Sequence, residues 1–368
     1  MSIALGLFVG CGIILLVSFF DSSFTFNGAL EGIQLILFGA FCEGRDETGR
    51  LVFGFDTANL GNLLFRATPV IMTGLSVAFA FRAGLFNIGT PGQYLIGASS
   101  SLMIALSLDT ETLSPFVVWV LAFTGSLVAG ALWGLIPGFL KAYFSVNEVI
   151  SGIMANWIAA NLVTWIFEKS SFRNLSQVGK VGYIMPSSFN GVSTTKLGLD
   201  KLFDTSQINA GIIVAVVIAV IVYVFLNKTT FGFEMKIFGS NRHVADYIGI
   251  SQKKIIIFSL AAAGALSGGA AALYYLSGNT EFFWSTYQSL PKEGFNGIPI
   301  ALLASNNPLA VIFTGIFIAF LNFAGQELKN LTSFNVYIAD IIIAVIVYLS
   351  AFSLVIRQYI SKRKGGLR

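Results

Sequence analysis

Two stretches of the sequence stay apolar for about 20 residues, the length that a helix needs to cross the hydrocarbon core of a bilayer. Residues 208–226 read INAGIIVAVVIAVIVYVFL, and residues 336–356 are similar; together they carry one charged residue, Asp340. The chain is 55% hydrophobic and 11% charged, whereas an average soluble domain is about 25% charged. These runs are continuously apolar, whereas the strands of a membrane barrel alternate polar and apolar residues, so the runs favour helices. We therefore expect an all-α, polytopic membrane helix bundle.

Breaker residues between the apolar runs divide the chain into about ten expected transmembrane segments. They lie near residues 3–20, 60–81, 89–108, 115–140, 146–167, 209–227, 254–277, 295–305, 308–324 and 337–356. The eighth is expected to be one short broken helix, because glycines and Pro299 interrupt it and residues 306–308 (NNP) end it. Such elements occur at membrane depth only inside a bundle or beside a water-filled cavity.

We expect a single transmembrane domain over residues 1–368. Its first span, 3–20, lacks a basic leading region and is expected to be retained, with a signal peptide as the alternative. Residues 21–59 form an outer loop, in which 29–42 are expected to be an interfacial or re-entrant helix. The remaining parts are the core bundle over 60–356, with a polar cytoplasmic loop at 228–253, and a basic cytoplasmic tail at 357–368.

The distribution of basic residues sets the expected orientation. With the N-terminus in the cytoplasm, 12 of the 22 Lys and Arg residues lie in short inner segments, as the positive-inside rule requires. We therefore expect a protein of the cell membrane whose two chain ends lie on the cytoplasmic side. The basic residues are dispersed over loops and the tail, so the net charge of +4 indicates membrane topology and no nucleic-acid partner.

No constellation for catalysis or metal binding is present in the sequence. Cys11 and Cys42 show no CxxC spacing, and the sole histidine, His243, has no ligand or nucleophile partner nearby in the sequence. A G-x-x-x-x-G-K-[ST] phosphate loop is also absent. We expect neither an enzyme nor a metal site nor a cofactor bound to this chain.

A polar inner loop, residues 227–254, lies between two strongly apolar runs. Its glycines delimit two expected short helices, 233–238 and 241–248. The second places Val244, Tyr247 and Ile248 at helical spacing, which suits docking into a groove on a partner. The alternative is an ordinary solvated connector.

Four sequence blocks, in order, resemble those of importer permeases of the ATP-binding-cassette (ABC) superfamily for ribose, branched-chain amino acids and nucleosides. The inner loop matches the pattern G-x6-G-x-N-x3-A-x-Y-x-G-I from Gly232 to Ile250, which looks like the coupling loop of these permeases. The blocks that resemble the nucleoside branch are 81–98 (FRAGLFNIGTPGQYLIGA), 147–156 (NEVISGIMAN) and 294–309 (GFNGIPIALLASNNPL).

The resemblance implies a permease subunit of an ABC importer that moves nucleosides across the cytoplasmic membrane. It implies separate ATPase subunits that bind ATP and Mg, a second homologous permease subunit, and an extracytoplasmic substrate-binding lipoprotein. An importer of a simple sugar, such as ribose or galactose, or of another purine-type solute is the nearest alternative. An ion-coupled secondary transporter is the alternative from another class. The residues expected to couple to the ATPase are Gly239, Asn241, Arg242, Ala245, Asp246, Tyr247 and Gly249.

One position departs from the nucleoside branch. The residue between Gly89 and Gly92 that is often acidic there is Pro91 in this chain. An ionic role for this position cannot be carried over, which weakens the inference of the substrate relative to that of the family.

Uncharged amides in or near apolar segments are the expected substrate-path residues, together with nearby aromatic rings. An unpaired amide is costly in a membrane, and amides satisfy the polar groups of a neutral nucleoside or sugar, on which rings stack. The expected path residues are Phe86, Asn87, Gln93, Asn156, Trp157, Phe295 and Asn296. The alternative for each amide is a bond between helices.

Two further expectations concern helix contacts. Asn147 is expected to cap the helix that Glu148 begins, and Glu148 to pair with a coupling-loop base such as Arg242. Residues 266–270 read LSGGA, close to the LSGGQ signature of ABC ATPases. Gly264 and Gly268 have GxxxG spacing, so close helix packing explains this segment better, and Gly130, Gly134 and Gly138 repeat that spacing.

Overall fold

The computed structural model describes residues 2–20, 26–174, 182–284 and 289–349. The expected tail at 357–368 and the end of the last expected span, 350–356, lie outside the described residues. The helices are α1 (Ser2–Phe20), α2 (Phe26–Phe38), α3 (Thr57–Arg82), α4 (Thr90–Ser107), α5 (Pro115–Phe144), α6 (Glu148–Glu168), α7 (Leu199–Leu202), α8 (Gly211–Lys228), α9 (Thr230–Ser240), α10 (Arg242–Tyr247), α11 (Gln252–Tyr275), α12 (Lys292–Leu303), α13 (Pro308–Leu331) and an unlabelled helix Tyr337–Leu349. Two 3-10 turns, η1 (Gly39–Phe41) and η3 (Ser187–Asn190), add to these.

Short antiparallel strands pair outside the helices. Strand β1 (Cys42–Arg45) pairs with β2 (Leu51–Phe53), and β3 (Tyr183–Ile184) pairs with β4 (Phe282–Phe283). The expected all-α polytopic class is therefore confirmed, and the described residues add two small sheets that the hydropathy pattern does not indicate: a local hairpin, β1–β2, and the pair β3–β4 of segments far apart in the sequence.

Six of the described helices are long and apolar enough to cross a membrane: α3, α5, α6, α8, α11 and α13. Shorter apolar helices cover Leu5–Phe20, Phe26–Phe41 and Tyr337–Leu349. The chain is thus a multi-pass membrane protein, and the count of about ten spans stays a prediction. Helix α12 is short, with 12 residues, as expected. It nevertheless continues through Pro299, and the chain breaks after it, at the left-handed residues Ser305 and Asn306.

The described chain groups into two compact units, with α3 and α13 running through both. Unit 1 comprises Met1–Ala67, Leu202–Ser206 and Ile316–Arg368, and unit 2 comprises Thr68–Lys201 and Gln207–Gly315.

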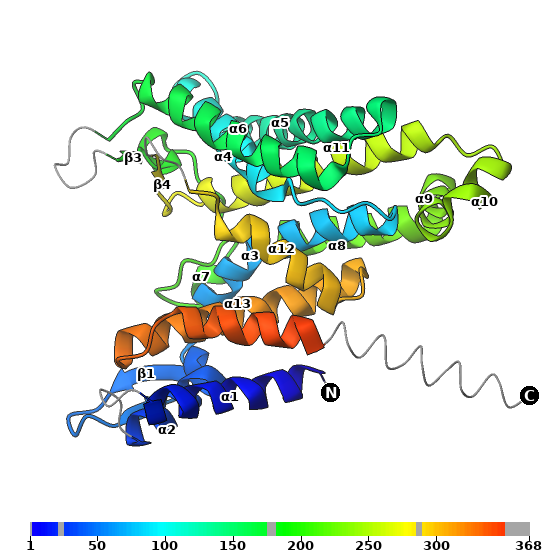
Figure 1. The fold of residues 1–368 in the computed structure, drawn as a ribbon. Helices are drawn as coiled ribbons and strands as arrows, with labels where there is room; N and C mark the ends of the chain where they lie inside the picture. The colour runs from blue at the N-terminus through cyan, green and yellow to red at the C-terminus, as the bar shows by residue number, and fades with distance from the viewer. Residues whose placement is uncertain (1, 21–25, 175–181, 285–288, 350–368) are drawn as a thin grey trace, which may run out of the picture. The chain divides into compact units, whose positions relative to one another are not determined.

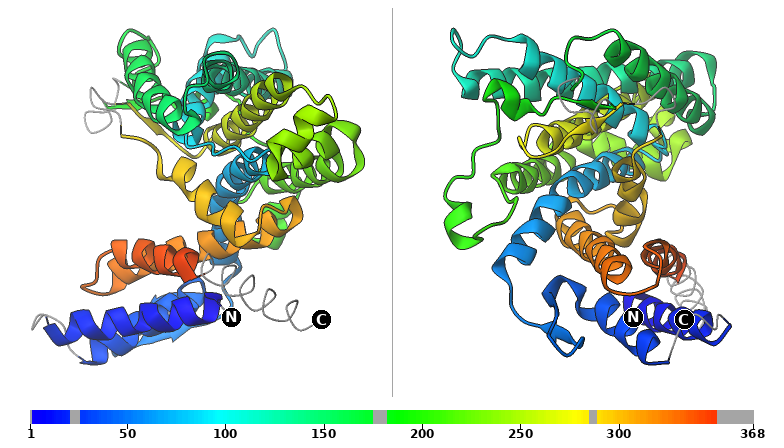
Figure 2. Two further views of the ribbon diagram at one scale, coloured as in Figure 1. Left: turned by 45° about the vertical axis from the view of Figure 1, so that its right-hand side comes forward. Right: turned by 90° about the vertical axis from the view of Figure 1, so that its left-hand side faces the viewer.

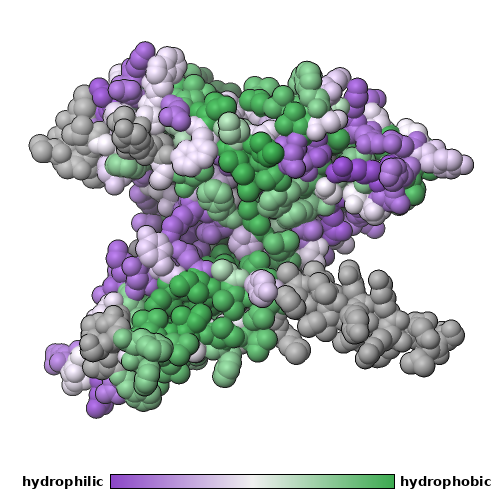
Figure 3. All heavy atoms as spheres, viewed as in Figure 1, coloured by the Kyte–Doolittle hydropathy of each residue, from purple (hydrophilic) through white to green (hydrophobic). Residues whose placement is uncertain are grey.

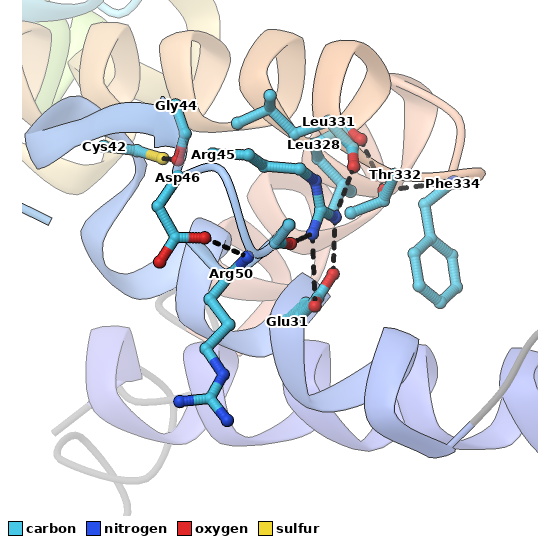
Figure 4. A network of polar contacts seen from close by, with 11 residues as sticks. Glu31, Cys42, Gly44, Arg45, Asp46, Arg50, Leu328, Leu331, Thr332 and Phe334 are labelled. Atoms are coloured by element: carbon cyan, nitrogen blue, oxygen red, sulfur yellow. Dashed lines mark hydrogen bonds and ion pairs between the residues drawn. The ribbon is translucent and has the colours of Figure 1, made fainter. Parts of the chain in front are cut away.

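Close helix packing and one ion pair hold unit 1 together. A methyl group placed on Gly6 or Gly10 of α1 would lie 2.3 or 2.5 Å from the side chain of Ile346 or Ile342. Arg45 of β1 donates to both carboxylate oxygens of Glu31, at 2.6 and 3.3 Å, and to the carbonyl oxygen of Leu331 at 2.8 Å (Figure 4). The ion pair ties the β1–β2 hairpin to α2 and to the end of α13.

Two glycine stripes set the core of unit 2. A methyl group on Gly130 would lie 2.3 Å from the carbonyl oxygen of Gly264, and one on Gly264 would lie 2.2 Å from that of Gly130. The Ser126 hydroxyl donates to the carbonyl oxygen of Gly268 at 2.6 Å. Helices α5 and α11 therefore pack backbone to backbone, which confirms the packing expected for residues 264–268 and 130–138.

The two ends of unit 2 differ in character. Helices α9 and α10 lie at one end of α8 and α11, and the β3–β4 pair lies at the opposite end (Figures 1 and 2). Hydrophilic residues gather over α9 and α10, and hydrophobic residues cover the middle of the long helices (Figure 3). The polar loop that separates the apolar runs 209–227 and 254–277 is thus a distinct structural element at one end of the bundle.

Candidate functional site

Residues 82–93 form the centre of the candidate site, and we call them the connecting segment. They comprise the last residue of α3, the turn after it and the first residues of α4. Gly84 stops the chain from continuing as α3, since it has a left-handed φ of +63°. Glycine adopts this conformation at little cost. Pro91 stands in the first turn of α4, where its fixed φ suits a helix start and its missing N–H is not needed.

A reciprocal amide pair closes the connecting segment on itself. Asn87 donates from Nδ2 to Oε1 of Gln93 at 2.9 Å, and Gln93 donates from Nε2 to Oδ1 of Asn87 at 3.2 Å. The same Asn87 oxygen accepts from the backbone N–H of Gly89 at 3.2 Å. Both side chains are buried. Protein groups therefore satisfy these two expected path residues.

Helix α6 holds the connecting segment through Asn156. The Asn156 side chain accepts from the backbone N–H of Gly92 and donates to the carbonyl oxygen of Ile88, each at 2.9 Å. It is 1% exposed. This third expected path amide thus bonds α6 to the connecting segment and has the interhelical role that was the alternative to solute contact.

We predict that Asn156→Leu destabilises the chain. Leucine has a similar size but leaves the Gly92 N–H and the Ile88 carbonyl unpaired, at about 1–3 kcal/mol for each group. The apparent melting temperature of the detergent-purified chain should therefore fall. The matched control is Asn161→Leu on the same helix, because among the described residues the exposed Asn161 side chain bonds the carbonyl oxygen of Trp157 alone, within α6. Equal melting temperatures for both variants and the parent would contradict the assignment.

Three further elements contact the connecting segment. From α11, the Ser267 hydroxyl donates to the carbonyl oxygen of Thr90 at 2.8 Å. From α12, a methyl group on Gly294 would lie 2.5 Å from Cα of Pro91. Pro91, which replaces the often acidic residue, therefore packs against a helix. The Arg82 guanidinium donates from Nε to the carbonyl oxygen of Asn306 at 2.7 Å, in the break that follows α12.

The fourth contact comes from α9. A methyl group on Gly239 would lie 2.5 Å from the carbonyl oxygen of Arg82 and 2.8 Å from the N–H nitrogen of Gly84. Both atoms belong to the backbone, so no side chain can move aside for it. The structure thus brings together all four sequence blocks that carried the resemblance, and the connecting segment is where they meet.

The two short helices expected in the polar loop are present, as α9 and α10. Asn241 caps α10, since its Oδ1 accepts from the backbone N–H groups of His243 and Val244 at 3.0 and 3.2 Å. Gly249, with a φ of +80°, ends the turn that follows α10. Lys236 of α9 donates to Oδ1 of Asn227 at 2.7 Å; burial, with a smaller contribution from the charge of Arg82, lowers the pKa of Lys236.

Ala245 is the buried side chain of α10. Two exposed side chains contact neighbouring residues: Asp246 accepts from Gln252, and the Arg242 guanidinium lies 5.4 Å from the centre of the Phe238 ring. Tyr247 is 93% exposed. Val244 and Ile248 are also exposed, as is Phe233 of α9, which lies outside the expected docking helix. The helical spacing identified the exposed apolar surface, here called the α10 surface: Val244, Tyr247 and Ile248.

Glu148 has a different partner from the expected one. It forms an ion pair with Lys141 of α5, and both side chains are mostly buried. Ser145, with a left-handed φ of +57°, turns the chain between α5 and α6 and brings these two residues together. The expected pairing with Arg242 is therefore not the one in the structure. The expected cap is confirmed, since Asn147 accepts from the backbone N–H of Val149 at 2.8 Å.

The remaining expected path residues lie at accessible positions. Trp157 and Phe295 are exposed by 53% and 38%. Asn296 is half-buried, and so is Phe86, whose ring centre lies 5.4 Å from that of Phe81. The seven expected path residues thus fall into two groups. Three amides are buried and hydrogen-bonded to other protein groups, and the other four residues are accessible.

The sequence matches one protein family over residues 59–351, described as the permease component of the branched-chain amino acid transport system. The guanosine ABC transporter permease protein NupP of Bacillus subtilis is 34% identical over 83% of this chain and 84% of its own. The nucleoside permease NupB of Lactococcus lactis is 33% identical over 83% of each chain. The glucose permease TsgB13 of Haloferax volcanii is 31% identical over 82% of this chain and 78% of its own.

Bacillus subtilis also has a second guanosine ABC transporter permease protein, NupQ. It is 26% identical to this chain over 70% of this chain and 78% of its own.

Proposed function

Because the chain belongs to the family of permease components of the branched-chain amino acid transport system, we propose that it translocates nucleosides as one permease subunit of an ABC importer in the cytoplasmic membrane. Members of this family are membrane conduits without catalytic activity or a cofactor of their own. ATP and Mg accordingly bind to separate ATPase subunits. A second homologous permease and an extracytoplasmic binding lipoprotein complete the proposed assembly.

The observation that carries the mechanism is the two-sided character of α9 and α10. On the outer side, the α10 surface exposes Val244, Tyr247 and Ile248 at the end of a membrane bundle. On the inner side, Gly239 lies against the backbone of residues 82–84. A partner that binds the exposed side therefore pushes or pulls directly on the connecting segment. The proposed orientation places α9, α10 and both chain ends in the cytoplasm, where the ATPase subunits are.

The connecting segment is suited to transmit this movement. Its contacts to α6, α11 and α12 are hydrogen bonds and backbone contacts with little slack. Well-packed elements respond to a displacement by moving together. The ATPase cycle would then bias unit 2 between arrangements that open the path to opposite sides of the membrane, by binding them with different affinity.

The nucleoside substrate is proposed from the similarity to the guanosine and nucleoside permeases. The similarity to a glucose permease keeps a sugar as the second candidate. The buried amides Asn87, Gln93 and Asn156 satisfy one another or the backbone. We therefore propose that these amides hold the connecting segment in its conformation. The accessible residues are proposed to contact the solute: Phe86, Trp157, Phe295 and Asn296.

We predict that Trp157→Ala weakens nucleoside uptake. A stacked ring contributes about 0.5–1.5 kcal/mol, so the solute concentration at half-maximal uptake should rise by about two- to tenfold. Trp157→Phe keeps a ring and should therefore retain most of the parent's apparent affinity for the solute. The control is Ile221→Ala on the exposed, apolar face of α8. Ile221→Ala should give a parent-like uptake curve. A parent-like curve for Trp157→Ala as well would show that Trp157 does not contact the solute.

The substrate class is tested by competition. Cells that lack their own nucleoside importers and express the full transporter should accumulate labelled guanosine. Unlabelled adenosine or uridine in excess should suppress this uptake, and glucose, ribose or galactose should not. Suppression by a sugar, without suppression by nucleosides, would replace the nucleoside proposal with the sugar alternative.

A further inference from the structure

A pocket of about 500 Å³ lies at the end of unit 2 that carries α9 and α10 (Figure 1). The last residues of α5, one side of α10 and the first residues of α11 line it. Its charged side chains are three cations, Lys141, Arg242 and Lys253, and one carboxylate, Asp246. We call it the basic pocket. A cavity of this size can hold a small ligand, and its excess of positive charge favours an anion.

Two of the three cations have no carboxylate partner in the part of the chain that the structure describes. Arg242 and Lys253 each lie against an aromatic ring instead; Nζ of Lys253 is 4.4 Å from the centre of the Tyr143 ring. A ring attracts a cation but carries no net charge that would cancel it. Lys141 has one carboxylate partner, Glu148, for its three N–H donors. The basic pocket thus retains positive charge on two sides.

The start of α11 adds backbone donors to the basic pocket. Ser251 is the N-cap of this helix, but its side chain makes no capping hydrogen bond. Ser251, Gln252 and Lys253 all line the pocket. The N–H groups in the first turn of a helix bind phosphate oxygens readily. Guanidinium, ammonium and N–H donors on several sides suit a tetrahedral phosphate, which has more acceptor oxygens than a planar carboxylate.

The position of the basic pocket indicates the source of the phosphate. Helices α5 and α11 are both long and apolar enough to span a membrane, and the pocket lies at the end of each. Tyr143 and Phe144, in the last turn of α5, are 54% and 66% exposed. Exposed aromatic residues at the end of a span lie at the level of the lipid headgroups. Basic pockets between membrane helices at this level bind anionic headgroups.

We propose that the basic pocket binds a phosphate group, and that an anionic phospholipid supplies it. In the proposed orientation this lipid belongs to the cytoplasmic leaflet. Arg242 and Lys253 donate to the phosphate oxygens, so the headgroup joins α10 to the start of α11. Arg242 and Asp246 are four positions apart on one side of α10, and the α10 surface lies on the other side. The lipid therefore leaves the α10 surface free, and the site does not depend on which solute is transported.

Lipid titration of the full-length permease tests the site. The delipidated chain in uncharged detergent is titrated with phosphatidylglycerol or phosphatidylcholine, and native mass spectrometry counts the bound lipids. Lys253→Gln removes one cation of the pocket, and Lys254→Gln is the matched control, because Lys254 is exposed but does not line the pocket. Lys253→Gln should weaken the tightest phosphatidylglycerol about tenfold, as expected for one lost hydrogen bond between charged groups. Lys254→Gln should bind it like the parent, and phosphatidylcholine should not distinguish the three proteins.

Inorganic phosphate, added to the same delipidated proteins, separates a lipid from a soluble ligand. We expect it to leave their apparent melting temperatures unchanged, because free phosphate lacks the acyl chains that hold a lipid at the membrane helices. A rise in melting temperature that Lys253→Gln abolishes, without a loss of phosphatidylglycerol affinity, would overturn the lipid and retain a site for a soluble phosphate compound. Equal phosphatidylglycerol affinities of Lys253→Gln and Lys254→Gln, with no response to inorganic phosphate, would overturn the site itself.

Discussion

Gly239→Val is expected to abolish ATP-driven transport while leaving the chain in the membrane. The first valine side-chain atom would lie 2.5 Å from the carbonyl oxygen of Arg82 and 2.8 Å from the nitrogen of Gly84. Such overpacking costs about 1–3 kcal/mol and is relieved only when α9 moves away from the connecting segment. The ATPase subunits would then still bind the α10 surface but would no longer move α4, α6 and α12. We expect uptake to fall at least about tenfold, as 1.4 kcal/mol of lost coupling would produce.

Two controls separate this effect from general misfolding. Gly12→Val in α1 makes the same change where, apart from the adjoining backbone of α1, no described atom lies within 4 Å of the first added carbon, and transport should be retained. The purified Gly239→Val complex should still contain its ATPase subunits and hydrolyse ATP, with a rate that no longer responds to solute and binding protein. Parent-like transport by Gly239→Val would contradict the role given to the contact.

Tyr247→Ala is expected to release the ATPase subunits. Tyr247 is 93% exposed at the end of α10, so its removal takes little from the fold of this chain. A tyrosine at the centre of an interface typically contributes about 2 kcal/mol or more, which corresponds to about 30-fold weaker binding. The measurement is co-purification of the ATPase subunits at decreasing protein concentration, with the apparent melting temperature of the permease recorded alongside.

The matched control for Tyr247→Ala lies at another exposed aromatic residue. Phe189 of η3 is 72% exposed, and Phe189→Ala should leave co-purification of the ATPase subunits unchanged. Tyr247→Phe keeps the ring and should retain most of the binding. Full ATPase recovery with Tyr247→Ala would exclude Tyr247 from the interface.

The long helices could be predicted from the sequence because apolar runs and caps are local signals. Residues 146–167 and 209–227 correspond to α6 and α8 within two residues at each end. The inner loop was also predictable, although α9 is longer than expected. Gly232 was expected to precede this helix but lies within it, where it packs against the backbone of α8 around Phe225. A glycine that allows close packing and a glycine that ends a helix are indistinguishable in a sequence.

The partners of the polar residues depend on tertiary structure and could not be predicted in the same way. The cost of an unpaired amide singled out Asn87 and Asn156, but a carbonyl oxygen 68 positions away, that of Ile88, satisfies Asn156. Glu148 pairs with Lys141 because Ser145 adopts a left-handed conformation, which no residue type there required. The β1–β2 turn at Asp46–Gly49 did carry a local signal, since aspartate and glycine favour turns.

The central claim is that this chain is a passive conduit driven by partner ATPases through α9 and α10, and proteoliposomes test it most directly. The measurement is uptake of labelled guanosine with binding protein outside and ATP inside, with the permease pair reconstituted with or without its ATPase subunits, and with ionophores that collapse ion gradients. We predict uptake that requires the ATPase subunits and ATP and persists with ionophores. Uptake by the permeases alone that ionophores abolish would contradict the account and indicate an ion-coupled secondary transporter.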